Sequence, residues 1–111
     1  MRLEALLAAL QELFGPRLSF GPAGREAVSV FWDGVSEGAV WSRADDPGDA
    51  ALFFLSAVHD AVLEGMGRRG EHPGPWADAS PRVTREGGNL RLSLHTPDGQ
   101  QAEVVVAVRE L

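Results

Sequence analysis

The chain has 111 residues, with a hydrophobic share of 44% and a charged share of 23%, which is the composition of one globular domain around one core. Ten arginines against sixteen acidic residues give a formal net charge of −6, which disfavours a nucleic-acid backbone as a ligand and favours a basic protein partner. Because the chain contains no cysteine, we exclude thiol catalysis, disulfide bonds and cysteine-bound zinc.

The first predicted element is an amphipathic helix over residues 2–14, which Gly15-Pro16 ends. Its apolar face consists of leucines at three- and four-residue spacing, namely Leu3, Leu6, Leu7, Leu10 and Leu13. Glu4 and Glu12 interrupt the apolar run, which argues against a targeting signal. The sequence has no run of 18 or more apolar residues that would predict a membrane span. We therefore expect a cytoplasmic protein that is not associated with a membrane.

The period of the hydrophobic pattern then changes from helical to alternating. The segment from Leu18 to Phe20 predicts a short strand, and residues 27–32 predict a longer one. One face of the longer strand carries Val28, Val30 and Trp32. Residues 33–38 hold turn residues at both ends, and the segment near 38–43 continues as a second strand. A hairpin follows from this pattern, in which Trp41 would face the tryptophan of the first strand.

The longest apolar stretch predicts a central helix over residues 49–66. Its buried face is indicated by residues at three- and four-residue spacing, namely Ala51, Leu55, Val58, Val62 and Met66. Asp49, or Asp46 ahead of a proline, can cap the first free amides. Three glycines, at positions 65, 67 and 70, are expected to end the helix. A polar line opposite the buried face consists of Ser56, Asp60 and Glu64.

Beyond the central helix the sequence returns to strands. Residues 67–81 form a long segment rich in proline and glycine, in which Trp76 is expected to pack the loop against the sheet. Strands are predicted near residues 82–86, 89–95 and 101–109, with alternate Leu and Val side chains facing inward. The expected fold is α+β, with one antiparallel sheet of about five strands and both helices packed on one of its faces.

The sequence offers little material for catalysis. Its three histidines fall in a helix, a loop and a strand, without the spacing of metal ligands. Ser56, His59 and Asp60 contain the residue types of a catalytic triad, but neighbours on a helix point about 100° apart and cannot act on one serine. Asp45, Asp46 and Asp49 could bind a cation, although helix capping explains them more simply. We therefore expect no catalytic residues, no metal site and no cofactor.

A partial motif follows the central helix: Gly70, then Pro75-Trp76, and then a hairpin turn at Gly88-Asn89. In this order of elements the chain, from Leu3 to Leu94, resembles the YezG-like immunity proteins of bacterial polymorphic toxin systems. In that family the helix runs into a glycine, two polar residues and Pro-Trp, and a hairpin with a small-residue-Gly-Lys turn follows. Here Asn89 takes the place of the lysine, and a strand over residues 101–110 replaces a tyrosine-rich one. The resemblance implies a binding protein that neutralises a cognate toxin, often a nuclease, by occupying its surface.

Acidity agrees with such a role, since an acidic protein suits a basic, nucleic-acid-cleaving partner. The acids that we expect to contact a basic toxin domain lie in two loops, with Asp33 and Glu37 in one and Asp45 and Asp46 in the other. Trp41 lies between these loops and is the candidate aromatic anchor. In the simpler interpretation the acids serve only solubility and helix capping, and the tryptophan packs within the sheet.

Two other classes of function stay open. A small acidic chaperone or adaptor, acting as a homodimer, would hold an extended segment of a partner protein on an exposed apolar patch. A small enzyme would need a deep polar pocket in which two or more titratable groups converge.

Overall fold

The structure is a computed structural model that describes residues 2–24, 27–41 and 44–111. The helices are α1 (Glu4–Phe14) and α2 (Pro47–Arg68), with short 3-10 helices η1 (Gly74–Asp78) and η2 (Val108–Glu110). The strands are β1 (Leu18–Gly24), β2 (Ala27–Trp32), β3 (Val35–Trp41), β4 (Ser80–Glu86), β5 (Asn89–His95) and β6 (Gln101–Ala107). Both predicted helices are therefore confirmed, and α2 extends two residues beyond its prediction at each end.

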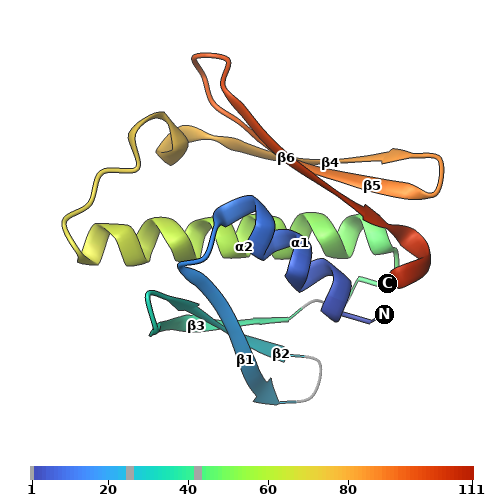
Figure 1. Ribbon diagram of the computed structural model, residues 1–111, viewed down its shortest axis with the longest axis horizontal. Coiled ribbons are helices and arrows are strands. Elements are labelled where there is room, and N and C mark those ends of the chain that lie inside the picture. Colours follow the sequence, from blue (N-terminus) through green and yellow to red (C-terminus); the bar gives the residue numbers. More distant parts are fainter. Residues whose placement is uncertain (1, 25–26, 42–43) are drawn as a thin grey trace.

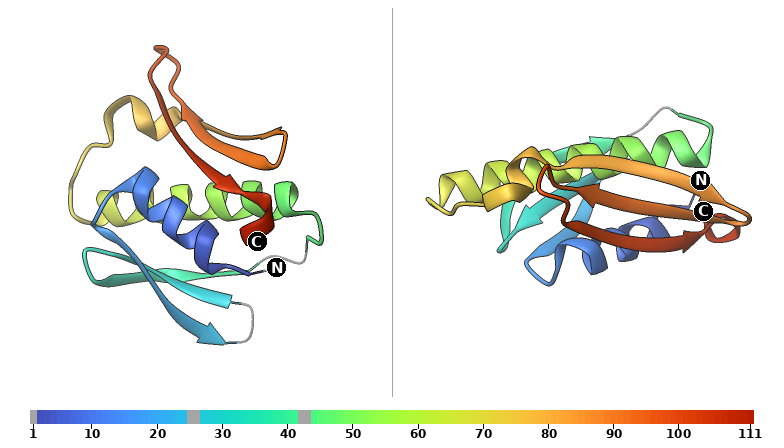
Figure 2. Two further views of the ribbon diagram at one scale, coloured as in Figure 1. Left: turned by 45° about the vertical axis from the view of Figure 1, so that its right-hand side comes forward. Right: turned by 90° about the horizontal axis from the view of Figure 1, so that it is seen from above.

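The strands form two antiparallel sheets of three strands, in the orders β1-β2-β3 and β4-β5-β6. The prediction of one sheet of about five strands is therefore wrong, whereas the α+β class is confirmed. Figures 1 and 2 show α1 and α2 as a middle layer, with one sheet below it and the other above it. The helices are thus covered from two opposite sides, not packed on one face of a single sheet.

The burial of α2 explains why it requires two sheets. Nine of its residues are buried, and they cover about half of the helix circumference. Gly65 lies against Trp32 of β2, whereas a Cβ on Gly48 would reach Leu90 of β5. A single sheet could not cover both of these sides of the helix. By length and hydropathy alone α2 could cross a membrane, but half of that stretch is buried inside the molecule, as in a core helix.

The first sheet differs from the predicted hairpin in its turn. Asp33 and Gly34 both have positive φ angles, 51° and 78°, as in a two-residue hairpin turn. Trp32 therefore pairs with Val35, while Trp41 pairs with Ala27 at the other end of the sheet. The predicted meeting of the two tryptophans is wrong, because the turn is shorter than expected. The predicted extension of β3 to Ser42 and Arg43 lies outside the described residues.

The second sheet agrees with the predicted meander. Its inner face buries Leu90, Leu92 and Leu94 together with Val104 and Val106 of the neighbouring strand, as expected. The last strand ends at Ala107, so the predicted strand over 101–109 is two residues too long. The residues that follow form η2. The cap of α2 is one of the two predicted residues, since the Asp46 carboxylate accepts a hydrogen bond from the Asp49 amide at 3.0 Å.

Candidate functional site

The structure separates the four acids that the sequence grouped as a partner-binding site. Asp33 and Glu37 lie at the end of α2 where the helix finishes, and Asp45 and Asp46 precede its first turn. Because α2 has 22 residues, its two ends are about 33 Å apart at 1.5 Å per residue. These acids therefore belong to two surfaces of the molecule.

Arginines of the chain itself bind the carboxylates at the C-terminal end of α2. Glu37 pairs with Arg68, and its side chain is only 2% exposed. Asp33 accepts hydrogen bonds from Arg17 at 2.6 and 2.9 Å and pairs with Arg69 at 3.0 Å. These two acids hold the β2–β3 turn to the rest of the molecule. A partner would have to displace these arginines to reach them.

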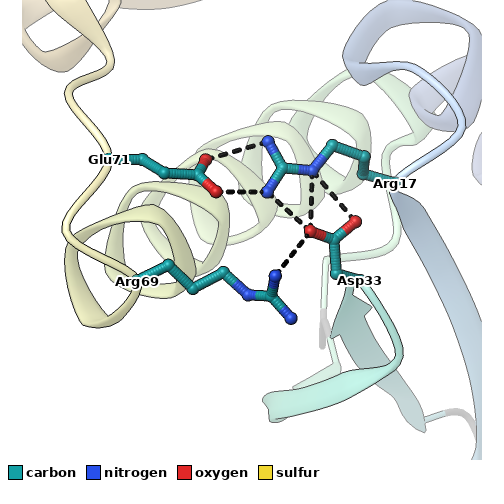
Figure 3. Close-up of polar contacts among 4 residues, drawn as sticks. All are labelled: Arg17, Asp33, Arg69 and Glu71. Carbon is teal, nitrogen blue, oxygen red and sulfur yellow. Dashed lines mark hydrogen bonds and ion pairs between the residues drawn. The ribbon is translucent and has the colours of Figure 1, made fainter.

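Arg17 is the centre of this cluster (Figure 3), and sequence reasoning missed it. Its guanidinium lies between the carboxylates of Asp33 and Glu71, the second at 2.7 and 2.9 Å. The hydrogen bonds from Arg17 hold the pKa of both carboxyls below its ordinary value, and the two carboxylates raise the pKa of Arg17. The guanidinium also lies over the Trp32 ring, 4.5 Å from its centroid. Arg17 therefore joins the α1–β1 connection to the β2–β3 turn and to the segment after α2.

We expect this cluster to make stability depend on pH. The lowered pKa values of Asp33 and Glu71 stabilise the fold above the unfolded-state pKa values, about 4, and this contribution is lost as pH falls through the folded-state values. Arg17→Met should thus lower the melting temperature at pH 7 and have much less effect at a pH low enough to protonate both carboxyls in the folded protein. Arg82→Met, at an exposed strand position, is the control. An equal loss at both pH values would instead assign the role of Arg17 to packing on Trp32.

The opposite side of α2 carries free acids around an aromatic ring. Asp49, Phe53, Ser56, Asp60 and Glu64 follow one another at three- and four-residue spacing, and we call this line the acidic face of α2. Phe53 is 50% exposed. Neither sheet covers this face, because α2 lies along one edge of the helix layer (Figure 2). In the described parts of the chain, none of its three acids forms an ion pair.

Trp41 and Asp45 lie at the end of the molecule where β3 finishes and α2 begins. Trp41 is 55% exposed at the end of β3, which leaves its ring available to a partner. Asp45 is exposed, and Asp46 is occupied by its capping bond. The sequence had already indicated Asp60 and Glu64 as a polar line. It had not indicated that Phe53 stands beside that line in solvent, 50% exposed.

An apolar cleft of about 360 Å³ lies on another side of α2. Its walls come from the last turn of α1, the second half of α2, the segment around η1 and strands β2, β5 and β6. Its lining includes the aromatic side chains of Phe14, Trp32 and Trp76, the thioether of Met66 and the side chain of Arg17. The cleft is apolar, with two ionisable side chains, Arg17 and His59, in its wall.

His59 is buried in the wall of this cleft. It is 6% exposed, and its Nε2 lies 2.9 Å from the carbonyl oxygen of Trp76. The Phe14 ring stacks on the imidazole at a centroid distance of 6.3 Å. Trp76 packs against the core, as predicted for its loop. His59 thus fixes the segment between α2 and β4 to the helix.

Residues with metal-binding side chains do not gather in the described part of the chain, where no group of three His, Asp or Glu could hold an ion. His72 is exposed, and the Nε2 of His95 contacts the Ser93 hydroxyl at 2.9 Å. Comparison of the chain with known protein families, curated proteins and solved structures gave no match.

Proposed function

We propose that the protein binds a basic protein partner through the acidic face of α2 and neutralises it as an immunity protein does. The observation that carries the proposal is the exposed line of Asp49, Asp60 and Glu64 around Phe53, in which no acid forms an ion pair with a described residue. Unpaired carboxylates attract a basic surface over long distances, and an exposed ring can supply affinity when it is desolvated. The resemblance to YezG-like immunity proteins supports the same class of partner, a basic toxin domain in the cytoplasm.

The proposed interface differs in part from the residues that the sequence suggested. Trp41 and Asp45 stay in it, because both are exposed at the end of the molecule where α2 begins. Asp33 and Glu37 are left out, because Arg17, Arg69 and Arg68 already bind their carboxylates. Asp46 contributes indirectly by capping the helix that carries the face. The role assigned to these residues is recognition, with no cofactor and no catalytic step.

The test compares two double charge reversals that change net charge equally. Asp60→Arg with Glu64→Arg alters the acidic face, whereas Glu12→Arg with Asp78→Arg alters exposed acids elsewhere. Binding is measured to the product of the reading frame beside this gene, at two salt concentrations. We expect the first pair to slow association about tenfold or more and to reduce its salt dependence, and the second pair to have a small effect. Equal effects of the two pairs, or no binding by the wild type, would contradict the proposal.

A second candidate function is an adaptor or chaperone that holds an apolar segment of a partner. The observation in its favour is the pair of exposed rings, Trp41 and Phe53. Salt separates the two functions, because it screens attraction between charges and leaves apolar burial intact. Binding that persists in both charge-reversed variants but is lost in Phe53→Ala would favour the adaptor.

A further inference from the structure

We infer that the cleft between α1, α2 and the η1 segment is a binding site for a neutral aromatic ring that carries one hydrogen-bond donor, such as an indole or a phenol. The inference does not depend on the proposed function, because the cleft and the acidic face lie on different sides of α2. At 3.6 residues per turn, His59 and Met66 of the cleft point about 100–160° away from Asp60 and Glu64.

The cleft has the size and the lining of a pocket for an aromatic ligand. Its volume of about 360 Å³ lies within the range of ligand pockets, about 300–1,000 Å³. Phe14, Trp32 and Trp76 present aromatic surface from three separate elements, and Met66 adds a polarisable thioether. Aromatic rings favour offset or edge contacts with other rings, and methionine sulfur also favours ring contacts. A flat aromatic group fits this lining better than an extended polar chain does.

The charges in the wall of the cleft favour a neutral ligand. Arg17 is the permanent cation in the wall of the cleft, and the carboxylates of Asp33 and Glu71 both bind its guanidinium. Its charge is thereby compensated within the protein, so the site does not require an anion. A cationic ligand would meet this same guanidinium and the apolar rings without a free carboxylate. The ligand is therefore neutral.

The Nδ1 atom of His59 can accept a hydrogen bond from a ligand. A carbonyl oxygen can only accept a hydrogen bond, so the Nε2 of His59 carries the proton that it shares with Trp76. In the neutral imidazole the Nδ1 is then an acceptor, and it has no hydrogen-bond partner in the described residues. His59 as a residue is 6% exposed, and it lines the cleft. A ligand with an N–H or O–H group would satisfy this acceptor.

The test uses indole and its isostere benzofuran, in which an oxygen replaces the N–H group. Both are titrated into the wild-type protein, and the indole N–H signals of Trp76 and Trp41 are followed by NMR. We expect indole to shift the Trp76 signal with a dissociation constant of roughly 1 mM, a typical affinity for so few atoms. The Trp41 signal, which is outside the cleft, should stay in place. Benzofuran should bind about three- to tenfold more weakly, because it cannot donate to Nδ1.

A pair of variants tests whether binding occurs in the cleft. Ala102 lies in the cleft wall, and Val105 lies on the exposed face of the same strand. Ala102→Leu fills the cleft and should weaken indole binding about tenfold or more, while Val105→Leu should leave it unchanged. A Trp76 signal that does not shift, equal affinity for benzofuran, or binding that survives in a folded Ala102→Leu variant would overturn the inference.

The two sources of such a ring are a free small molecule and an aromatic side chain of a partner protein. N-acetyltryptophanamide carries the same indole with the two amides of a peptide. If it binds at least as tightly as indole, the site takes a side chain of a partner. If the added amides prevent binding while indole still binds, the site takes a free small molecule.

Discussion

Replacing Phe54 with alanine is expected to lower the free energy of unfolding by about 3–5 kcal/mol, as other truncations of buried rings do. Phe54 is 1% exposed and belongs to the core cluster, on the buried side of α2. The truncation removes apolar surface from the core and leaves a cavity in the helix layer. Two sheets hold that layer from opposite sides, so the surroundings cannot easily collapse into the space.

Phe53→Ala is the matched control, because it makes the same chemical change one residue earlier. Phe53 is 50% exposed, and its ring meets the edge of Phe54 at a centroid distance of 6.4 Å. Its truncation should lower stability by less than about 1 kcal/mol. Urea unfolding of the wild type and of the two variants measures both effects. Similar losses at the two positions would show that α2 is not oriented as the structure has it.

The local pattern of the sequence was sufficient to predict the helices and the faces of the strands. Repeats at Ala51, Leu55, Val58, Val62 and Met66 predicted the buried side of α2, and the first four residues are buried while Met66 is partly buried. Alternation likewise predicted that Leu90, Leu92 and Leu94 face inward. Both patterns repeat within a few residues, so they depend on neighbours along the chain and not on distant contacts.

The division of the six strands into two sheets could not be predicted in the same way. Alternation tells which face of a strand is buried, but it does not tell which other strand lies along its edge. A signal was nevertheless present in α2, where Phe54 and Ala61 widen the apolar face beyond the stripe that one covering sheet needs. The breadth of that face indicates a helix that is covered on two sides.

The candidate site was predicted only in part, because charge counts do not show which acids are already paired. Arg17 is 16 residues from Asp33, and Arg68 is 31 residues from Glu37. Such pairs form only when the fold brings distant segments together. Asp60 and Glu64 pair with no arginine of the described residues, because they lie on a helix face that neither sheet covers. The exposed faces of an element therefore have to be known before its acids can be assigned to a partner.

The C-terminal half of α2 shows a further difference between pattern and structure. The glycines at 65 and 67 were expected to end the helix, but it continues to Arg68 with both inside it. Gly65 is buried against the first sheet, and a Cβ there would lie 3.0 Å from the Cδ1 and 3.1 Å from the Cβ of Trp32. Gly67 is exposed, and a Cβ there would meet no atom within 4 Å. Gly65 therefore allows close packing of helix and sheet, while Gly67 has no such role.

The same substitution at these two glycines should consequently have opposite effects. Gly67→Ala should stabilise the protein by about 0.5–1 kcal/mol, because alanine favours the helix and loses less backbone entropy on folding. Gly65→Ala gains the same helix preference, but its methyl group has to displace Trp32, whose Cβ is anchored in β2 and cannot rotate away. Overpacking of this kind costs about 1–3 kcal/mol, so a net loss is expected. Urea unfolding measures both changes, and a Gly65→Ala variant as stable as Gly67→Ala would show that α2 and the first sheet pack less closely than this.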